Sequence, residues 1–539
     1  MSGCRRKRRV GAGRATACAL GSALVLCAGV RALAAGAEAS ARANPFETDA
    51  LCTPANVVDE LVERRLKALG IQPAKLCSDA VFVRRAYLEL TGTLPGAQEA
   101  AAFIASRDPD KRRALIDRLL QRDEFADYQA MRWSDALRIK AEFPINLWPN
   151  AAQAYHRWVR AAIRDNKPYD IFARELLTAT GSNFREPPVN FWRATQNREP
   201  VGLAQAVALT FMGTRAERWP SNKLAGLAAF FSQVGYKSTG EWKEEIVFWN
   251  PAASNAAAAG VLPDGHTVAF DGRRDPRALF ADWLVDAKNP WFTRAVANRI
   301  WAWLFGRGLV HEPDDLRPDN PPVHPELLAR LEVELVAARY DLKHLYRLIL
   351  NSRTWQRSCI PASDDPRSET HFAHYPLRRL DAEVLIDVIC RLTGSGEKYI
   401  SPIPEPFTVM PADQRAVALP DGSITSPFLE LFGRPPRDTG LASERNNRIT
   451  AAQRLHLLNS SHIQRKLEDS PLVRNLARGG QSPRDIVQGL YLAILSRYPT
   501  EAELQTVAGY FRAAAGRSRE AALDLAWALL NSPEFLYRH

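Results

Sequence analysis

Residues 289–322 read NPWFTRAVANRIWAWLFGRGLVHEPDDLRPDNPP and combine aromatic residues, arginines and aspartates in one helix and one long turn. Asn289 can cap a helix whose first position is Pro290, where a missing N–H costs nothing. Gly306 and Gly308 can end that helix. Between these limits, apolar residues fall on one face at helical spacing: Val296, Ile300, Trp303 and Leu304. The stretch therefore predicts an amphipathic helix that runs into a long polar turn.

The turn after this helix is strongly acidic. It begins at His311 and includes Asp314 and Asp315, while Arg299 of the helix is placed to pair with them in bidentate fashion. One interpretation is a polar pocket with paired carboxylates. The other is a charge network that pins a long loop to a helix. The sequence leaves both open.

Helical periodicity extends over most of the chain, which predicts a mainly α, multi-helical protein of two domains. A Pro-Asp-Gly turn at 263–265 followed by alternating residues predicts a small β-hairpin insertion near the domain junction. The expected organisation is a signal peptide at 1–34, a flexible leader at 35–50, an N-terminal helical domain at 51–235, a β-containing connector at 236–272 and a C-terminal helical domain at 273–539.

One pattern occurs twice along the chain. Tyr87, Leu88, Leu90, Pro95 and Glu99 recur at identical spacing as Tyr491, Leu492, Ile494, Pro499 and Glu503. The matching positions are mostly apolar, so packing explains them better than a duplicated binding unit does. We predict a recurring helical-hairpin module.

The first 34 residues predict export. A basic run at 5–9 precedes an apolar segment at 15–30, and residues 32–34 supply a small-x-small cleavage site. We expect an exported protein of the periplasm or cell envelope; a leader retained as an anchor is the alternative.

The leader holds seven basic and no acidic residues, so the net charge of +11 falls to +4 after cleavage. Nucleic-acid binding then loses its electrostatic support, and no later segment is long and apolar enough to span a membrane.

Four cysteines follow the predicted leader, and in an exported protein such cysteines can form disulfide bonds. Local pairing, Cys52 with Cys77 and Cys359 with Cys390, is the expected one of three connectivities. No two cysteines are spaced as C-x-x-C, so zinc, iron–sulfur and thioredoxin-like readings have no support.

Several motifs resemble a known pair of families. The stretches 82–95, 117–120, 166–170 and 175–177 resemble the planctomycete-type cytochrome-associated family, domain of unknown function 1549. Residues 289–322 resemble its usual partner, domain of unknown function 1553, and further matches lie at 340–344, 351–354, 378–383, 432–435, 455–459 and 531–535. The resemblance implies an envelope setting but no known reaction.

One departure from the first family removes its cofactor. Many members carry a haem-attachment-like C-x-x-C-H, and here the corresponding segment 211–220 reads FMGTRAERWP. Covalent c-type haem needs two thiols and an iron-binding histidine. We therefore predict no cofactor. The remaining redox hypothesis is that this chain is a partner of a redox protein and carries no haem of its own.

The remaining signals leave enzyme and binding protein open. Neither a P-loop nor G-x-S-x-G, H-E-x-x-H or G-x-G-x-x-G is present, and His371-x-x-His374 alone is a weak metal signal, so no metal site is predicted. An envelope carbohydrate-active hydrolase would draw its acid/base pair from Asp314, Asp315 and Glu444, with Arg299 and Arg445 orienting the substrate.

The preferred hypothesis is a haem-less binding or assembly component whose partner is an envelope protein or a polysaccharide. Tryptophans near turns and element ends are placed to stack on sugar rings, although buried tryptophans with satisfied N–H groups explain them equally: Trp148, Trp158, Trp192, Trp219, Trp242, Trp249 and Trp291.

Overall fold

The computed structural model describes residues 44–49, 53–478, 481–514 and 516–539. Residues 46–539 form one compact unit. The predicted signal peptide at 1–34 lies outside the described residues, as does most of the leader at 35–50. The domain boundaries at 235 and 273 stay predictions.

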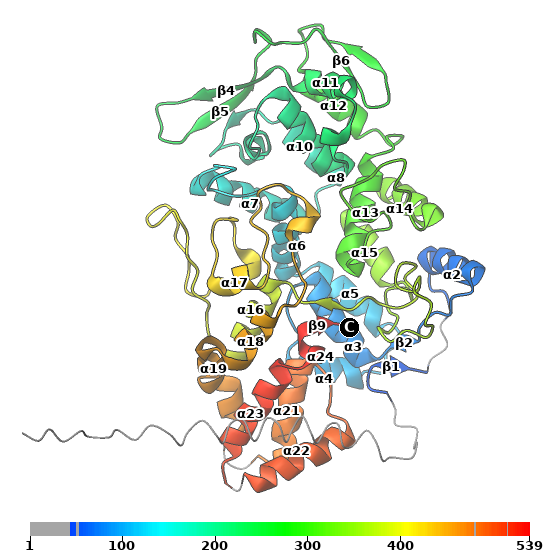
Figure 1. Cartoon of the computed structure of the whole chain (residues 1–539), viewed down its shortest axis with the longest axis vertical. Helices are drawn as coiled ribbons and strands as arrows, with labels where there is room; N and C mark the ends of the chain where they lie inside the picture. Colours follow the sequence, from blue (N-terminus) through cyan, green and yellow to red (C-terminus); the bar gives the residue numbers. More distant parts are fainter. Residues whose placement is uncertain (1–43, 50–52, 479–480, 515) are drawn as a thin grey trace, which may run out of the picture. The chain divides into compact units, whose positions relative to one another are not determined.

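The prediction of a mainly α protein is confirmed, and Figure 1 shows helices along the whole described chain. The first half contains α2 (Val57–Leu69), α3 (Asp79–Leu90), α4 (Ala97–Ala105), α5 (Lys111–Leu120), α6 (Asp123–Ala136), α7 (Pro149–Arg164), α8 (Tyr169–Thr178), α9 (Asn190–Arg193), α10 (Pro200–Met212) and α11 (Ser221–Ala228). The second half contains α12 (Pro276–Leu284), α13 (Phe292–Phe305), α14 (Pro325–Ala337), α15 (Leu342–Leu350), α16 (Ala382–Thr393), α17 (Pro427–Leu431), α18 (Ala451–Asn459), α19 (Ser461–Glu468), α20 (Pro471–Leu476), α21 (Pro483–Leu495), α22 (Glu501–Ala513), α23 (Ser518–Leu530) and α24 (Pro533–Leu536). Short 3₁₀ turns are η2 (Pro187–Val189), η3 (Ala216–Arg218), η4 (Ala229–Phe231), η5 (Ala416–Ala418) and η6 (Ala442–Glu444).

Strands are few and short, and the predicted hairpin insertion is present. The strands are β1 (Glu47–Thr48), β2 (Leu76–Cys77), β3 (Gly181–Ser182), β4 (Val234–Ser238), β5 (Glu245–Trp249), β6 (Ala259–Val261), β7 (Thr267–Ala269), β8 (Arg378–Arg379) and β9 (Tyr537–Arg538). Antiparallel β4 and β5 pair Val234 with Trp249 and Ser238 with Glu245, and β3 joins on the other side of β5. The second hairpin, β6–β7, lies beside α11 (Figure 1).

The helix predicted from the opening stretch is α13, and it begins two residues later than expected. Trp291 is the N-cap residue, and the side chain of Asn289 binds the backbone just before and at the start of α13, where its Oδ1 accepts hydrogen bonds from the N–H groups of Trp291 (3.0 Å) and Phe292 (3.1 Å). Gly306 ends it in the left-handed conformation (φ 75°). Three of the four predicted face residues are buried, and Trp303 is half-buried.

Buried apolar side chains form two groups that do not follow the predicted boundaries. The larger group runs from Val58 to Tyr375 and gains only Ile403 and Leu492 from later residues. The smaller group unites residues from Leu380 to Leu536 with four side chains from the N-terminal part of the chain: Leu88, Leu94, Tyr128 and Met131. The N-terminal helices α3 and α6 thus contribute to both cores.

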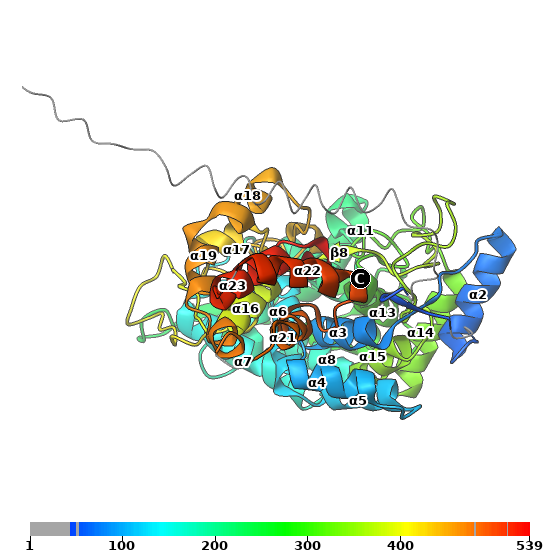
Figure 2. The same ribbon diagram turned by 90° about the horizontal axis from the view of Figure 1, so that it is seen from below.

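The repeated sequence pattern corresponds to repeated structure. Helices α3, α4 and α5 are matched in order by α21, α22 and α23, and in each copy a glutamate at the third helical position bonds back to the backbone N–H of the cap residue. The two copies touch, since buried Arg84 of α3 donates from Nη1 to the carbonyl oxygen of Ile494 (2.8 Å). Figure 2 shows α21 beside α3 and α4.

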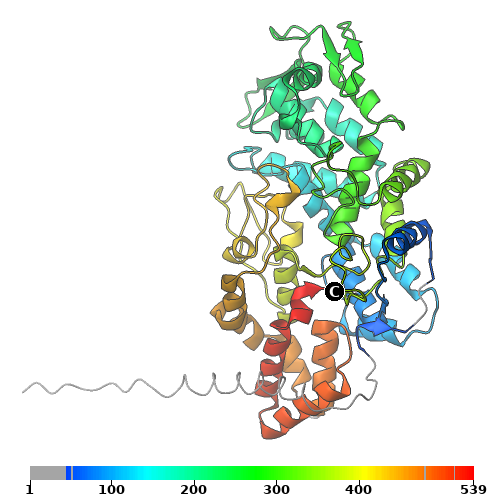
Figure 3. The same cartoon turned by 45° about the vertical axis from the view of Figure 1, so that its right-hand side comes forward.

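The C-terminal residues run into the protein rather than over its surface (Figure 3). Strand β9 pairs with β8, and Arg538 and His539 are buried. The carbonyl oxygen of His539 accepts a 2.9 Å hydrogen bond from Nε of Arg85 in α3. Within the described residues, none of the helices is both long enough and apolar enough to cross a membrane.

One of the two expected cysteine pairs is not formed. Cys359 and Cys390 carry free thiols, so there is no bridge between them. The two thiols have different surroundings: Cys390 lies 3.4 Å from Nζ of Lys466, whereas the segment before Cys359 pairs with the chain at Leu76. Cys52 lies outside the described residues, so its pairing with Cys77 stays a prediction.

Candidate functional site

Asp314 is buried and both of its carboxylate oxygens are engaged. Oδ1 lies 3.3 Å from Nη2 of Arg299, and Oδ2 accepts a 2.6 Å hydrogen bond from the backbone N–H of Ala442. Arg299 also donates to the carbonyl oxygens of Thr210 (2.7 Å) and Leu209 (3.2 Å). These contacts tie the acidic turn to α10, α13 and η6. They favour the charge network that pins the loop to the helix over the polar pocket with paired carboxylates.

The neighbouring Asp315 has different partners. It lies 3.3 Å from Nη1 of Arg218 and 3.1 Å from Nε of Arg317. Both guanidinium groups form ion pairs with the Asp315 carboxylate. Asp314 and Asp315 are therefore adjacent in sequence but each is committed to arginine, which suits a structural role better than proton transfer.

The segment that replaces the haem-attachment motif packs against this acidic turn. Arg215 lies 3.6 Å from Glu312, Arg218 reaches Asp315, and the backbone N–H of Leu316 donates to the carbonyl oxygen of Gly213 (2.9 Å). The segment offers guanidinium groups where covalent haem would need thiols and an imidazole. Its side chains do not fit haem, and their contacts connect the N-terminal half of the chain to the acidic turn in the C-terminal half.

Arg445 lies inside a buried ionic network. Its guanidinium donates to both carboxylate oxygens of Glu383 (2.7 and 3.0 Å) and to Asp135 (2.7 Å), and it lies 3.8 Å from Asp381. Arg538 completes the network through Asp381 (2.9 Å). Three of the five N–H donors of Arg445 are thereby bonded to carboxylates, which suits a structural role better than orienting a substrate.

The same network explains the motif at 378–383. Arg378 pairs with buried Glu89, and Arg379 donates to the backbone carbonyl groups of Phe432 and Asn447. Burial opposes ionisation of Asp381, but the guanidinium groups of Arg538, Arg445 and Arg132 outweigh it and hold the Asp381 pKa well below its ordinary value. The motif therefore locks the C-terminal segment onto α3 and α6.

Glu444 differs from the other predicted carboxylates. Burial raises its pKa, and only Oε1 is engaged, by the N–H (2.7 Å) and hydroxyl (2.6 Å) of Thr439. Its Oε2 has no hydrogen-bond partner among the described residues. Asp438 beside it pairs with Lys140 (2.6 Å). Glu444 is thus a single protonatable carboxyl without a free carboxylate partner.

A pocket of about 220 Å³ lies between α7 and residues 399–426, an irregular segment before α17 that we call the insertion. Space of this size holds about seven waters at the liquid's ~30 Å³ each, which is less than drug-sized sites offer. Its polar lining comes mainly from α7, while the insertion adds apolar side chains; the lining residues are Gln153, His156, Arg157, Val409, Met410, Gln414, Ala418, Pro420 and Ile424.

His156 lines this pocket, although no sequence motif marks it as a functional residue. It is buried, and its Nε2 has no partner within the described chain. Burial lowers its pKa to about 3, with help from the positive charge of Arg437. The imidazole is therefore neutral at physiological pH, and its Nε2 is buried without a hydrogen-bond partner among the described residues.

Three aromatic rings gather at the surface beside the same two segments. Trp148 at the start of α7 lies 4.7 Å from Trp242 of the β4–β5 connection and 5.3 Å from Phe407 of the insertion, measured between ring centroids. Trp242 and Phe407 are 5.4 Å apart. Trp242 is 61% exposed and Phe407 38%. We call these three residues the aromatic patch; Lys243 lies above two of its rings, at 5.2 and 5.7 Å.

The sequence placed two of these rings near turns but not together. Trp192, from the same set of tryptophans, is fully buried, and Trp249 is half-buried with its N–H bonded to Gln233 (2.7 Å). Phe407 carried no sequence signal, because nothing marks a lone phenylalanine in an irregular insertion. Only the folded chain shows which aromatic side chains meet at the surface.

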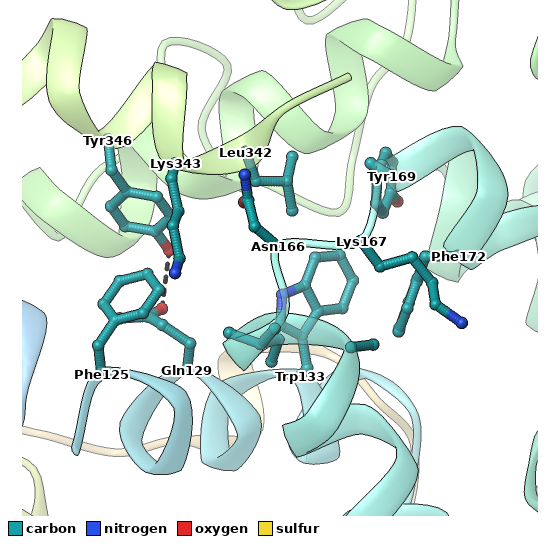
Figure 4. Close-up of a pocket in the computed structure, with 12 residues that line it drawn as sticks. Phe125, Gln129, Trp133, Asn166, Lys167, Tyr169, Phe172, Leu342, Lys343 and Tyr346 are labelled. Atoms are coloured by element: carbon teal, nitrogen blue, oxygen red, sulfur yellow. Dashed lines mark hydrogen bonds between the residues drawn. The ribbon is translucent and has the colours of Figure 1, made fainter. Parts of the chain in front are cut away.

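A second pocket, drawn in Figure 4, is too small for a ligand. It lies among α6, the α7–α8 turn and α15, where Tyr346 donates to Oε1 of Gln129 (2.7 Å). Its volume of about 30 Å³ matches one water at liquid density. Lys343 lines this pocket, and burial lowers its pKa.

Family models match both halves of the chain. The N-terminal match is to PSCyt2, a protein of unknown function (DUF1549), over residues 57–221, and the C-terminal match is to PSD1, a protein of unknown function (DUF1553), over residues 276–511. Neither the curated proteins nor the solved structures give a match. The chain therefore belongs to the planctomycete-type proteins in which a DUF1549 domain is followed by a DUF1553 domain.

Proposed function

We propose that this chain is an exported, haem-less binding component of the cell envelope that recognises a polysaccharide through the aromatic patch. The observation that carries the proposal is the meeting of Trp148, Trp242 and Phe407, from three distant segments, at one exposed place. Exposed apolar clusters with polar surroundings commonly mark interaction sites.

The chemistry of the patch suits sugar rings. A pyranose ring has apolar C–H faces that stack on aromatic rings and a rim of hydroxyl groups that form hydrogen bonds. The three rings would take the faces, and Lys243 stands beside them. The adjoining pocket supplies further hydrogen-bonding groups in Gln153, Arg157 and Gln414, and the neutral imidazole of His156.

Contacts of the acidic side chains favour binding over hydrolysis. Glycoside hydrolysis ordinarily needs two carboxyl groups that face each other across the bond to be cut. Asp314 and Asp315 are paired with arginines, and Glu444 keeps one free oxygen without a second free carboxylate. The hydrolase alternative therefore rests on Glu444 alone.

A retention assay on insoluble polysaccharides tests the proposal. Purified mature protein is passed over cellulose, chitin, xylan and isolated peptidoglycan, and the bound fraction is measured with the Trp242→Ala/Phe407→Ala variant in parallel. We expect retention on at least one polymer, reduced at least tenfold in the variant. Tyr498→Ala, which removes an exposed ring outside the patch, is the matched control and is expected to bind normally.

Two results would overturn the proposal: no retention on any of these polymers, or equal retention of the patch variant. Release of reducing sugar by the wild type that disappears in Glu444→Gln would support the hydrolase instead.

A further inference from the structure

Two histidines face each other at the joint between α18 and α19. Nε2 of His456 lies 3.4 Å from Nδ1 of His462. The helices are separated by Ser460 alone, whose hydroxyl caps α19 by accepting from the N–H of Ile463 (3.3 Å). The short connection holds the two imidazoles at a fixed angle.

The distance between these nitrogens fits a shared metal ion. A metal bound to imidazole at about 2.0–2.1 Å with tetrahedral angles places two such nitrogens about 3.4 Å apart. A direct N–H···N hydrogen bond at 3.4 Å is long compared with the usual 2.7–3.2 Å of protein hydrogen bonds. The pair is therefore better spaced for a metal than for each other.

The surroundings of His462 orient it as a ligand. Its other ring nitrogen, Nε2, donates to Oε2 of Glu397 (2.9 Å), which also lies 3.3 Å from Nζ of Lys466. This places the proton on Nε2 and leaves the lone pair of Nδ1 pointing at His456. A carboxylate behind a metal-binding histidine is the arrangement that fixes the tautomer in known metal sites.

Aromatic packing holds both rings from one side. Phe428 lies 5.7 Å from His456 and 6.0 Å from His462 between ring centroids, and Phe432 lies 6.1 Å from His456. Both histidines remain half-exposed, which leaves the other side open to solvent.

We infer that His456 and His462 form a binding site for Zn²⁺ or a similar late first-row divalent ion. Imidazole is a preferred ligand of this class of metal. Over the described parts of the chain, no three His, Cys, Asp or Glu side chains converge on one point, so the protein supplies two ligands. Water, or a donor atom of a bound partner, fills the remaining positions, as in open rather than closed zinc sites.

Calorimetric titration of tag-free mature protein with Zn²⁺ tests this inference. We expect one equivalent to bind, with affinity reduced at least tenfold in His456→Ala and in His462→Ala. Glu397→Gln keeps both ligands and is expected to weaken binding by about 10–100-fold. Two controls are expected to bind as the wild type does: His266→Ala, which removes an exposed histidine elsewhere, and Cys390→Ser, which removes the thiol near Lys466.

A second measurement on the wild type does not depend on how the variants fold. Electron paramagnetic resonance of the protein loaded with one equivalent of Cu²⁺ should show coupling to two imidazole nitrogens. Absence of Zn²⁺ binding, unchanged affinity in both histidine variants, or a Cu²⁺ spectrum without nitrogen coupling would each contradict the assignment.

Discussion

Asp314 accepts a 2.6 Å hydrogen bond from the backbone N–H of Ala442, 128 residues further along the chain. Its other oxygen faces Arg299, so one buried carboxylate joins the acidic turn, α13 and η6. The most conspicuous polar stretch of the sequence is thus a structural clamp. We propose that recognition takes place elsewhere, on the surface formed by α7, the β4–β5 connection and the insertion.

Replacing Asp314 with Asn should cost stability. Arg299 would keep its backbone acceptors but lose its charged partner in a buried setting, and breaking a buried pair costs about 3–5 kcal/mol. Urea unfolding of the mature protein measures the loss. Asp319→Asn, which breaks an exposed pair with Arg317, should change the free energy of unfolding by less than about 1 kcal/mol. Equal effects of the two substitutions would contradict the clamp.

The two helical modules should respond unequally to the same substitution. Glu99 caps α4 through the N–H of Gly96 and accepts from the hydroxyl of Tyr87, so Glu99→Gln should cost about 1 kcal/mol. Both oxygens of Glu503 bind Arg497 at 2.8 Å, whereas Glu99 lies 3.5 Å from Arg122, and short charged hydrogen bonds are stronger. Glu503→Gln should therefore cost about 2–3 kcal/mol.

The urea midpoints of both variants give the comparison between the modules. A larger loss for Glu99→Gln than for Glu503→Gln would show that the paired arginine contributes little.

Asp387 should make stability depend on pH in an unusual direction. Burial raises its pKa to about 6, against the opposing effects of Arg415 and two backbone N–H donors. The folded state then binds this proton more tightly than the unfolded state, whose pKa is near 3.9. The cost of the buried charge, at most about 3 kcal/mol, is present above pH 6 and is relieved as the pH falls toward 4.

Unfolding free energies of wild type and Asp387→Asn at pH 7, 6, 5 and 4 isolate this group, since the other titrations cancel in the difference. The wild type should gain stability relative to the variant as the pH falls. A difference that stays constant over this range would show that Asp387 titrates normally.

Much of the fold was predictable because its signals are local. Asn289 and Gly306 delimit α13 to within two residues, and the turn at 263–265 placed β7 (Thr267–Ala269) correctly. The recurrence of Tyr87 and Glu99 as Tyr491 and Glu503 gave the repeated helices. Spacing along one segment carries this kind of information.

The candidate site was not predictable in the same way, because its contacts join remote residues. Asp135 meets Arg445 across 310 positions, and no spacing rule covers that distance. The sequence marked Arg445 as polar and available, whereas the fold commits it to three carboxylates. Trp148 and Phe407 are likewise brought together only by tertiary packing.

The most direct test of the account compares polysaccharide affinity with and without the ring of Trp242. Calorimetric titration of wild type and Trp242→Ala with soluble fragments of whichever polymer retains the protein gives both dissociation constants. Since Trp242 is 61% exposed, its removal should leave folding intact, which the urea midpoint verifies. The account predicts at least a tenfold weaker affinity for the variant. An unchanged dissociation constant in a normally folded Trp242→Ala protein would contradict it.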